Sequence, residues 1–456
     1  MYWANFLHIY QPPNQKESML RKIVGESYQK IIQGLKENPK AKLTLNINAC
    51  LTELLMKYGF KDVVFDLKNL AERGQIEFTG SAKYHAFLPL LPENEIERQI
   101  RLNKITNQKY FGKVYSPKGF FPPEMAFSDK VAKIVKKLGY KWILADEASL
   151  PGDPDYSKIY KIKGMGDFKI FFRERETSFK ILSAQLASGP MLIADLGERL
   201  KKHNYLLTAM DGETFGHHRP GLEKLLFDIY KSEELPTVTI SELENYFKDE
   251  VVCEPVSATW TLMHKDLARN VPFSRWDDPD NEIHQLQWKL TNLAIKVVNY
   301  SNNKKTKEWK KAREMLDRAL HSDQYWWASA KPWWSLELLE KGAKELKDVV
   351  LTAPDALAAE KRQAKNLYQK IVFTALNWQR EGIVDDLVKE HYDEEVTMRI
   401  DTSAPYVPPE EFDKIIEHLR QQMVECAKME EFERAAQFRD RIKELKQKRE
   451  EATKKI

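Results

Sequence analysis

The sequence contains little cysteine for its length. Only three cysteines, Cys50, Cys253 and Cys426, occur in 456 residues, and they lie far apart. None of the spacings between them is the short spacing that zinc ligands or redox pairs have. Such sparse cysteines exclude a disulfide-stapled scaffold and are typical of free thiols in a reducing compartment. We therefore expect a cytoplasmic protein without a metal site.

Long apolar runs are also missing. No run reaches the roughly 18 apolar residues that cross a bilayer, and no basic segment followed by an apolar one resembles an export signal. The formal net charge of +4 is small for this length, so neither nucleic acid nor a membrane is expected as a partner. The sequence has no G-x-S-x-G, P-loop or dinucleotide-binding motif, and no cofactor is expected.

Short apolar runs alternate with segments of helical period in the first half of the chain. The expected strands lie at 3–9, 42–47, 75–79, 118–121, 141–145, 169–172, 205–210 and 237–240. Helical segments such as 129–138 and 221–231 lie between them, and strands that alternate with helices favour a parallel sheet. Seven or eight such units favour a (β/α) barrel, whose chemistry gathers at the carboxyl ends of the strands.

The second half of the chain has a different pattern. Residues 281–391 are mostly helical in period, and a proline-rich stretch follows, which stiffens a linker and stops a helix. Apolar residues three and four apart then predict a pair of short helices. We expect four parts: a catalytic barrel at 1–265, a helical domain completing the active-site cleft at 266–400, a linker at 401–410 and a helical hairpin at 411–449.

Two acidic residues follow predicted strands directly. Asp211 ends the run 205–210, and Glu124 follows 118–121 behind Pro122 and Pro123, which fix the backbone. Cleavage of a glycosidic bond needs two carboxyl groups at one bond, one to attack or activate water and one to protonate the leaving oxygen. Each residue alone also fits an ordinary strand-to-helix turn or a solvated loop, so the pair remains a hypothesis at this point.

A metal site is the rival interpretation of the segment after Asp211, which contains His217 and His218. Adjacent residues point in different directions in a strand or a helix, so this pair is poorly arranged for one ion. The sequence has no H-E-x-x-H motif. Carboxyl chemistry is therefore favoured over metal chemistry.

Four segments resemble the ordered motifs of glycoside hydrolase family 57. They are HIYQPPNQ from His8, GQIEFTGSAKYHAFLPLL from Gly74, GFFPPEMAFS from Gly119 and DGETFGHH from Asp211. The resemblance implies an α/β fold: an incomplete (β/α)7 TIM-like barrel followed by a mainly helical domain, with retaining chemistry on α-glucans. It also implies that Glu124 is the nucleophile and Asp211 the general acid/base.

The same resemblance implies a set of substrate-binding residues. Three of them, His8, Glu77 and Glu213, would contact the sugar at the cleaved bond. The full set is His8, Gln11, Glu77, His85, Glu213, His217, His218, Trp260, Trp276, Asp323 and Trp326. A fifth family motif would come from 257–260 or from 276–281, and the segment 321–327 resembles the helical element that closes over the site.

The end of the chain resembles a second family. The stretch LRQQMVECAKMEEFERAAQFRDRIKELKQ, residues 419–447, is similar to the UVR motif of excision-repair subunits and of some regulators of proteases. The resemblance implies a helical hairpin that pairs with a protein partner or with a second copy of itself. A generic pair of charged helices is the alternative.

The main hypothesis is a retaining enzyme that hydrolyses or transfers α-1,4-glucan chains, an amylase or a 4-α-glucanotransferase, with an α-glucan or maltooligosaccharide as substrate. One alternative is a glucan-binding regulator that signals through the hairpin. Another is a metal-dependent carbohydrate deacetylase on a similar barrel. The presence of both Glu124 and Asp211 argues against a pure binding protein, and sensitivity to a chelator would identify the deacetylase.

Overall fold

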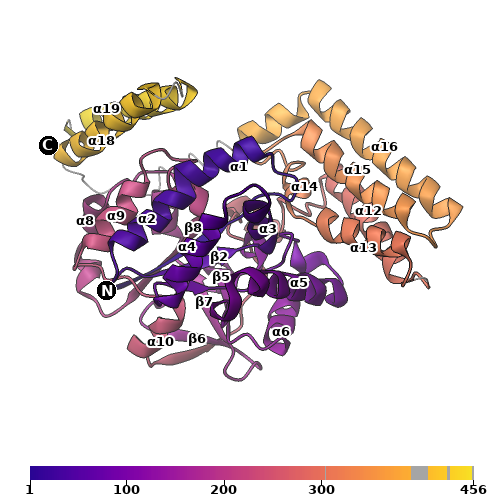
Figure 1. Ribbon diagram of the computed structural model, residues 1–456, viewed down its shortest axis with the longest axis horizontal. Helices are drawn as coiled ribbons and strands as arrows, with labels where there is room; N and C mark the ends of the chain where they lie inside the picture. The colour runs from indigo at the N-terminus through magenta and orange to yellow at the C-terminus, as the bar shows by residue number, and fades with distance from the viewer. Residues whose placement is uncertain (303, 392–408, 429–431, 454–456) are drawn as a thin grey trace.

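The computed structural model describes residues 1–302, 304–391, 409–428 and 432–453. Figure 1 shows three parts: an α/β body, a group of helices beside it in orange, and a pair of helices in yellow. The α/β body contains two sheets, with strand orders β3-β2-β1-β8 and β4-β5-β7-β6-β9. The strands are β1 Tyr2–Ile9, β2 Leu43–Ile47, β3 Ile76–Phe78, β4 Gly119–Phe120, β5 Trp142–Asp146, β6 Ile159–Ile162, β7 Lys169–Arg173, β8 Tyr205–Asp211 and β9 Glu250–Cys253.

The two sheets join into one curved structure. A parallel bridge between Gly80 and Phe120 connects β3 to β4, and the amide of Glu174, just past the end of β7, donates to the carbonyl of Leu207 in β8 at 2.8 Å. Within the described residues, β1 to β5, β7 and β8 run in one direction, whereas β6 lies antiparallel to β7 and parallel to β9. This arrangement confirms the predicted α/β fold class with parallel strands and is consistent with an incomplete (β/α)7 barrel.

Alternation along the strands separates the inside of the barrel from the layer under the helices. In β1, Ala4 and Phe6 belong to an inner apolar cluster, whereas Trp3, Leu7 and Ile9 pack in the cluster under the outer helices. Successive strand residues point to opposite faces, so both faces of these strands can be apolar. Residues of β1 in step with Ala4 and Phe6 therefore face the barrel interior.

Helices surround the barrel strands, as Figure 1 shows. The predicted helix 129–138 is α6, and the predicted helix 221–231 is α9. The helices of this part are α1 Glu17–Ile23, α2 Gln29–Glu37, α3 Ala49–Lys57, α4 Lys61–Glu72, α5 Glu93–Phe111, α6 Asp129–Lys137, α7 Arg175–Leu182, α8 Gly189–Leu196, α9 Glu223–Lys231, α10 Leu243–Tyr246 and α11 His264–Ala268.

One predicted strand is wrong, and two observed strands were not predicted. At 237–240 only Thr237 forms an isolated bridge, to Trp3. Thr239 instead caps a 3-10 turn at Ile240–Glu242, with the reciprocal hydrogen bonds of a capping box, which is the local signal that outweighs the apolar pattern. Strand β9 is at the edge of the second sheet, with β6 between β9 and β7, and each has only four residues, too few for a strong apolar pattern.

The helical part contacts the barrel through one continuous apolar cluster, which includes Phe87 and Ile100 of the barrel and Trp288 and Leu339 of the helices. A short antiparallel bridge between Ala86 and His321 brings the start of α14 against the barrel loop. Its helices are α12 Glu282–Asn299, α13 Lys307–Ala319, α14 Asp323–Trp326, α15 Leu336–Thr352 and α16 Ala358–Arg380.

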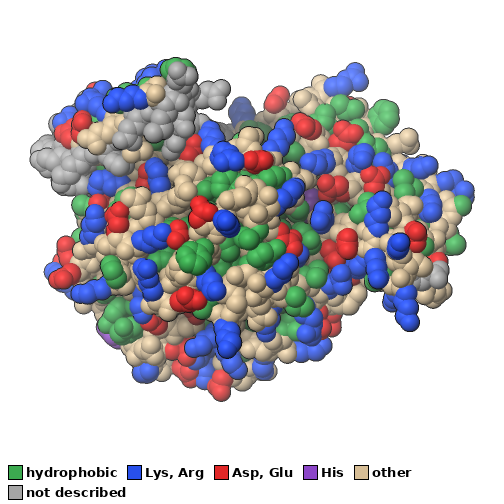
Figure 2. All heavy atoms as spheres, in the orientation of Figure 1, with side chains coloured by type: hydrophobic (Ala, Val, Ile, Leu, Met, Phe, Trp, Pro, Cys, Tyr) green, Lys and Arg blue, Asp and Glu red, His purple; other side chains and the backbone are tan. Residues whose placement is uncertain are grey.

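The predicted hairpin consists of α18 Pro409–Lys428 and α19 Phe432–Thr453. Apolar side chains of the two helices, among them Ile415 and Phe438, are buried in the same cluster as the outer barrel layer. Most of the predicted linker at 401–410 lies outside the described residues. On the face shown in Figure 2, basic and acidic side chains are interspersed, consistent with the small net charge.

A buried ion cluster joins the barrel to the helical part. Arg313 of α13 donates twice to Glu95 of α5, at 2.8 and 2.9 Å, and once to Asp317, at 2.9 Å. Arg98 of α5 also donates to both oxygens of Asp317, at 2.6 and 2.7 Å. The side chains of Arg313, Glu95 and Asp317 are at most 5% exposed. Each charge is therefore desolvated and depends on its partners for compensation.

Replacing Arg313 by alanine should destabilise the protein by about 3–5 kcal/mol, because Glu95 and Asp317 would remain buried with fewer compensating donors. Urea unfolding of the full chain, followed by circular dichroism, measures this change. Lys137→Ala is the control, since Lys137 forms an exposed pair with Glu97 and its loss should have little effect. Equal unfolding midpoints for the two variants would contradict the assignment.

Candidate active site

The parallel register of β1 and β8 places His8 directly beside Asp211. Asp211 is in step with Leu207 and Ala209, which belong to the inner apolar cluster, just as His8 is in step with Ala4 and Phe6. Period-two alternation therefore directs both side chains to the same side, at the carboxyl ends of their strands. The position of Asp211 at a strand exit, which the sequence suggested, is the reason that it reaches this site.

Glu124 reaches the site by a strained turn. Strand β4 ends at Phe120, and Glu124 adopts φ 62° and ψ 16°, the left-handed region, with Met125 also at positive φ. Non-glycine residues adopt this conformation at a cost of about 1–3 kcal/mol and are concentrated at functional sites. The carboxylate of Glu124 accepts from Trp260 Nε1 at 3.2 Å and from Ser322 Oγ at 3.1 Å, so two donors fix its orientation.

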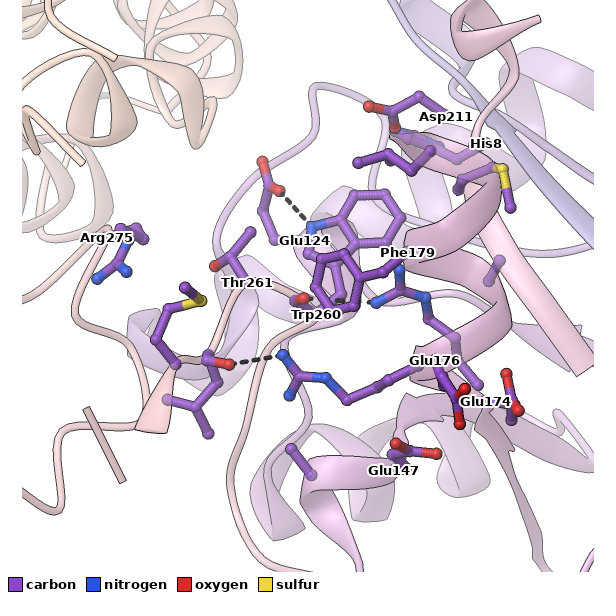
Figure 3. Close-up of a pocket in the computed structure, with 18 of the residues that line it drawn as sticks. His8, Glu124, Glu147, Glu174, Glu176, Phe179, Asp211, Trp260, Thr261 and Arg275 are labelled. Carbon is purple, nitrogen blue, oxygen red and sulfur yellow. Dashed lines mark hydrogen bonds between the residues drawn. The ribbon is translucent and has the colours of Figure 1, made fainter. Parts of the chain in front are cut away.

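Glu124 and Asp211 line the same pocket, which encloses about 1290 Å³. Pockets for drug-sized ligands measure about 300–1,000 Å³, so this one has room for an oligosaccharide. Figure 3 shows Glu124 with its hydrogen bond from Trp260, and His8 and Asp211 nearby. The predicted residues that line the pocket are His8, Gln11, His85, Glu124, Asp211, Glu213, His218, Trp260, Asp323 and Trp326.

Three predicted residues do not line this pocket. Glu77 points to Ser241, whose amide donates to its carboxylate at 3.1 Å, and Trp276 is fully buried against Phe87 at 4.9 Å between ring centroids. His217 pairs with Glu26 at 2.5 Å. Of the two candidate segments for the fifth motif, only 257–260 therefore reaches the pocket, through Trp260.

Glu124, Asp211, Glu213 and Asp323 are four of the carboxyl groups that line the pocket. Burial, together with the negative charges of Asp323 and Asp211, raises the pKa of Glu124 to about 8, against the donors on its oxygens. Burial and the charge of Glu213 hold the pKa of Asp211 well above its usual range, against the opposing charge of Arg173. Both groups can therefore hold or release a proton near neutral pH.

Several donors hold the other two carboxyl groups. Burial alone would raise the pKa of Asp323, but His321 and Tyr10 lower it, with hydrogen bonds of 3.1 and 2.6 Å. The second group, Glu213, accepts from the amide of Tyr10 at 3.3 Å, from Gln11 at 3.0 Å and from the hydroxyl of Tyr28. Gln11 was predicted to bind substrate, and Tyr10 and His321 stand inside quoted segments, whereas Tyr28 carried no sequence signal.

A π-helical turn, Val24–Tyr28, carries both Glu26 and Tyr28 to the loop after Asp211. Such turns are rare and are frequent at functional sites, and no residue pattern in this stretch predicts one. Glu26 contacts His217 and Tyr28 contacts Glu213, so one turn of the chain fixes two positions of this loop.

A row of hydrogen bonds leads from His8 to Glu124. The Nε2 atoms of His8 and His85 are 3.0 Å apart, and Nδ1 of His85 lies 2.9 Å from Ser322 Oγ. Burial lowers the pKa of His85 to about 4, so its ring is neutral. The two ring nitrogens of His85 thus link His8 to Ser322, and the hydroxyl of Ser322 donates to Glu124. His85 and Ser322 therefore orient Glu124.

Two features are absent from the described residues. No group of three or more histidine, cysteine, aspartate or glutamate side chains among them is arranged to hold a metal ion. In the same ranges, no helix is both long and apolar enough to cross a membrane.

Paired carboxyl groups at the strand ends of a barrel, one held by fixed donors and one beside further carboxylates, are the arrangement of glycoside hydrolases. The sequence profile of Glycosyl hydrolase family 57 matches residues 1–256, and that of the UvrB/uvrC motif matches residues 413–448. The first match covers more than half of the chain, and the chain belongs to glycosyl hydrolase family 57.

Individual relatives are more distant. Alpha-amylase 1 of Dictyoglomus thermophilum is 27% identical over 149 residues, which is 32% of this chain and only 21% of that relative. The 4-alpha-glucanotransferase of Thermococcus litoralis superposes with a TM-score of 0.61 and 18% identity, over 76% of this chain and 58% of that one. A branching enzyme of Pyrococcus horikoshii gives a TM-score of 0.62 at 15% identity, over 89% and 98% of the two chains. The two structures share the fold of this chain.

Replacing Glu124 by glutamine should stabilise the folded protein near pH 8 and have little effect near pH 5. The folded state binds the Glu124 proton more tightly than the unfolded state, so the stability contribution of this group falls as pH rises from its ordinary pKa towards 8. Glutamine removes that loss, which is on the order of 3 kcal/mol at pH 8.

Thermal melting of both proteins across this pH range measures the difference. Asp167→Asn is the control, because Asp167 is 95% exposed and hydrogen bonding from Lys161 keeps its pKa below the ordinary value. A melting difference between Glu124→Gln and the parent that does not grow with pH would contradict the raised pKa.

Proposed function

We propose that the protein is a retaining enzyme that hydrolyses or transfers chains of α-1,4-glucan, with Glu124 as nucleophile and Asp211 as general acid/base. The observation that carries this proposal is that both carboxyl groups line one large pocket. Burial and neighbouring carboxylates raise the pKa of each group there. Names of relatives, which include an amylase, a branching enzyme and a 4-alpha-glucanotransferase, support α-glucan as the substrate class.

The two carboxyl groups have different surroundings, which supports different roles. When the pair carries one proton, Glu124 is the better site for the charge, because Trp260 and Ser322 both donate to it. Asp211 is the better site for the proton, because the charge of Glu213 disfavours its ionised form. An ionised nucleophile and a protonated acid are the combination that glycoside cleavage with retention requires.

In the first step, a Glu124 oxygen forms a bond to the anomeric carbon, and the bond from that carbon to the leaving oxygen breaks as Asp211 gives that oxygen its proton. In the second step, Asp211 takes a proton from water or from a sugar hydroxyl, and the freed oxygen displaces Glu124. Water gives hydrolysis and a sugar gives transfer. Once Glu124 is esterified its charge is gone, which lowers the proton affinity of Asp211 and suits it to act as a base.

The pocket walls fit a sugar substrate. The side chains of His8, Gln11 and Asp323 offer hydrogen-bond donors and acceptors, while Trp260 and Trp326 offer aromatic surface, and all five line the pocket. Sugars present hydroxyl groups at their edges and C–H groups on their faces, so a wall of this mixed kind can bind both.

Glu124→Ala should abolish turnover, because it removes the carboxylate that we assign to attack the anomeric carbon. Incubation with maltoheptaose, with and without chelator, followed by separation of the products by length, measures this. Longer and shorter products together indicate transfer, and shorter products alone indicate hydrolysis. Wild-type rates in the variant would refute the assignment of Glu124, and inhibition by the chelator would favour the deacetylase alternative.

Asp323→Asn should move the acid limb of the kcat/KM profile to lower pH. The negative charge of Asp323 raises the pKa of Glu124, and catalysis needs Glu124 ionised, so removing that charge lets activity begin at lower pH. Glu345→Gln is the matched control, because this carboxylate faces the far side of His321, at 3.9 Å. An unchanged or upward shift of the limb in Asp323→Asn would show that the nucleophile lies elsewhere.

A further inference from the structure

We propose that the C-terminal hairpin is a positioning element of the active site: Leu419 and Arg441 hold two loops that line one end of the pocket. We call two segments the pocket-end loops. The first is 182–185, which begins at the last residue of α7, and the second is 212–221, which follows Asp211. Leu182, Ser183 and Gln185 of the first loop and His218 of the second line the pocket. Figure 1 shows α18 and α19 beside α8, α9 and α2, on the same side of the barrel.

The first contact fixes the loop that follows Asp211. Leu419 of α18 is 1% exposed, and a Cβ atom built on Gly221 would lie only 2.3 Å from its Cδ2. Gly221 also has φ +84°, so both its conformation and its space call for glycine. The leucine therefore packs directly on the backbone at the end of loop 212–221.

The loop transmits this contact to the carboxyl groups. Between Gly221 and Asp211, the amides of His217 and His218 donate to the carbonyl of Glu213 at 3.2 and 2.8 Å. The segment is thus a closed turn, and a shift at its end moves Glu213 and His218. Glu213 in turn raises the pKa of Asp211 by its charge.

The second contact fixes the other loop. The guanidinium of Arg441 in α19 donates to the carbonyl of Ala184 at 3.0 Å, and Ala184 has φ 54°, an unfavourable conformation for alanine. Arg219, in the loop 212–221, donates from Nε to the carbonyl of Leu182 at 3.0 Å. The two pocket-end loops are therefore tied to each other and, separately, to the hairpin.

A third contact reaches the same place by another route. Gln422 of α18 accepts from Lys30 of α2 at 3.5 Å, and Lys30 also pairs with Glu223, the first residue of α9. Helix α2 continues directly from the π-helical turn whose Glu26 and Tyr28 contact the loop after Asp211. These three contacts, from Leu419, Arg441 and Gln422, thus end on segments that support one end of the pocket.

Release of the hairpin should therefore loosen this end of the pocket while leaving the barrel folded. The test uses the full chain with Leu419→Ala or Arg441→Ala, and hydrogen exchange read by mass spectrometry. In Leu419→Ala we expect exchange about tenfold faster in both pocket-end loops and unchanged exchange in β1 and β2. In Arg441→Ala we expect the increase mainly in 182–185.

Two matched variants serve as controls. Leu419→Met keeps the volume of the side chain and should keep exchange slow, whereas Phe432→Ala removes a hairpin residue that is 67% exposed and should change nothing in the loops. Unchanged exchange in both loops of Leu419→Ala and Arg441→Ala overturns the proposal, whether or not the hairpin itself exchanges faster.

Kinetics give a second readout, which rests on the proposed function. With maltoheptaose, Leu419→Ala should raise KM and alter the ratio of longer to shorter products, and Leu419→Met should restore both. If the wild-type protein does not act on α-glucans, the proposed function fails, while the exchange experiment still decides the role of the hairpin. Faster loop exchange with unaltered kinetics would restrict the hairpin to a structural role and would overturn the positioning role.

Discussion

The concentration of carboxyl groups in one pocket is the constraint on which the rest of the site depends. Glu124, Asp211, Glu213 and Asp323 line it together, and each like charge makes the others harder to ionise. Such a set is stable only if donors surround some members and protons remain on others. The tyrosine, histidine, serine and tryptophan side chains that point at these oxygens are therefore as much a part of the site as the carboxyl groups.

This constraint also explains why the barrel is not the whole active site. Parallel strands deliver Asp211 and His8 in register, but the donors for Glu124 come from elsewhere. Trp260 follows the last strand, and Ser322 precedes a short helix of the helical part. The buried ions between α5 and α13, together with the bridge at His321, hold that part against the barrel. The join between the two parts is therefore what completes the hydrogen bonding of Glu124.

The hairpin adds a third layer to the same design. Its contacts, through Leu419 and Arg441, reach segments that surround the second carboxyl group, while the helical part reaches the first. Regions distant in sequence thus support the two catalytic candidates separately. A change in either region acts first on one carboxyl group and reaches the other through their charges, because Asp211 raises the pKa of Glu124. This is a physical basis for adjusting the reaction from outside the barrel.

The sequence by itself determined the alternation of strands and helices, the family motifs, the position of Asp211 at a strand exit and the two helices of the hairpin. These are local properties, because period, turn residues and short motifs act within a few residues along the chain. Tertiary structure alone decided that Glu77 and Trp276 turn away from the pocket and that Tyr28 and Ser322 donate to Glu213 and Glu124. It also decided the raised pKa of Glu124, because burial and the charges of distant residues exist only once the chain has brought them together.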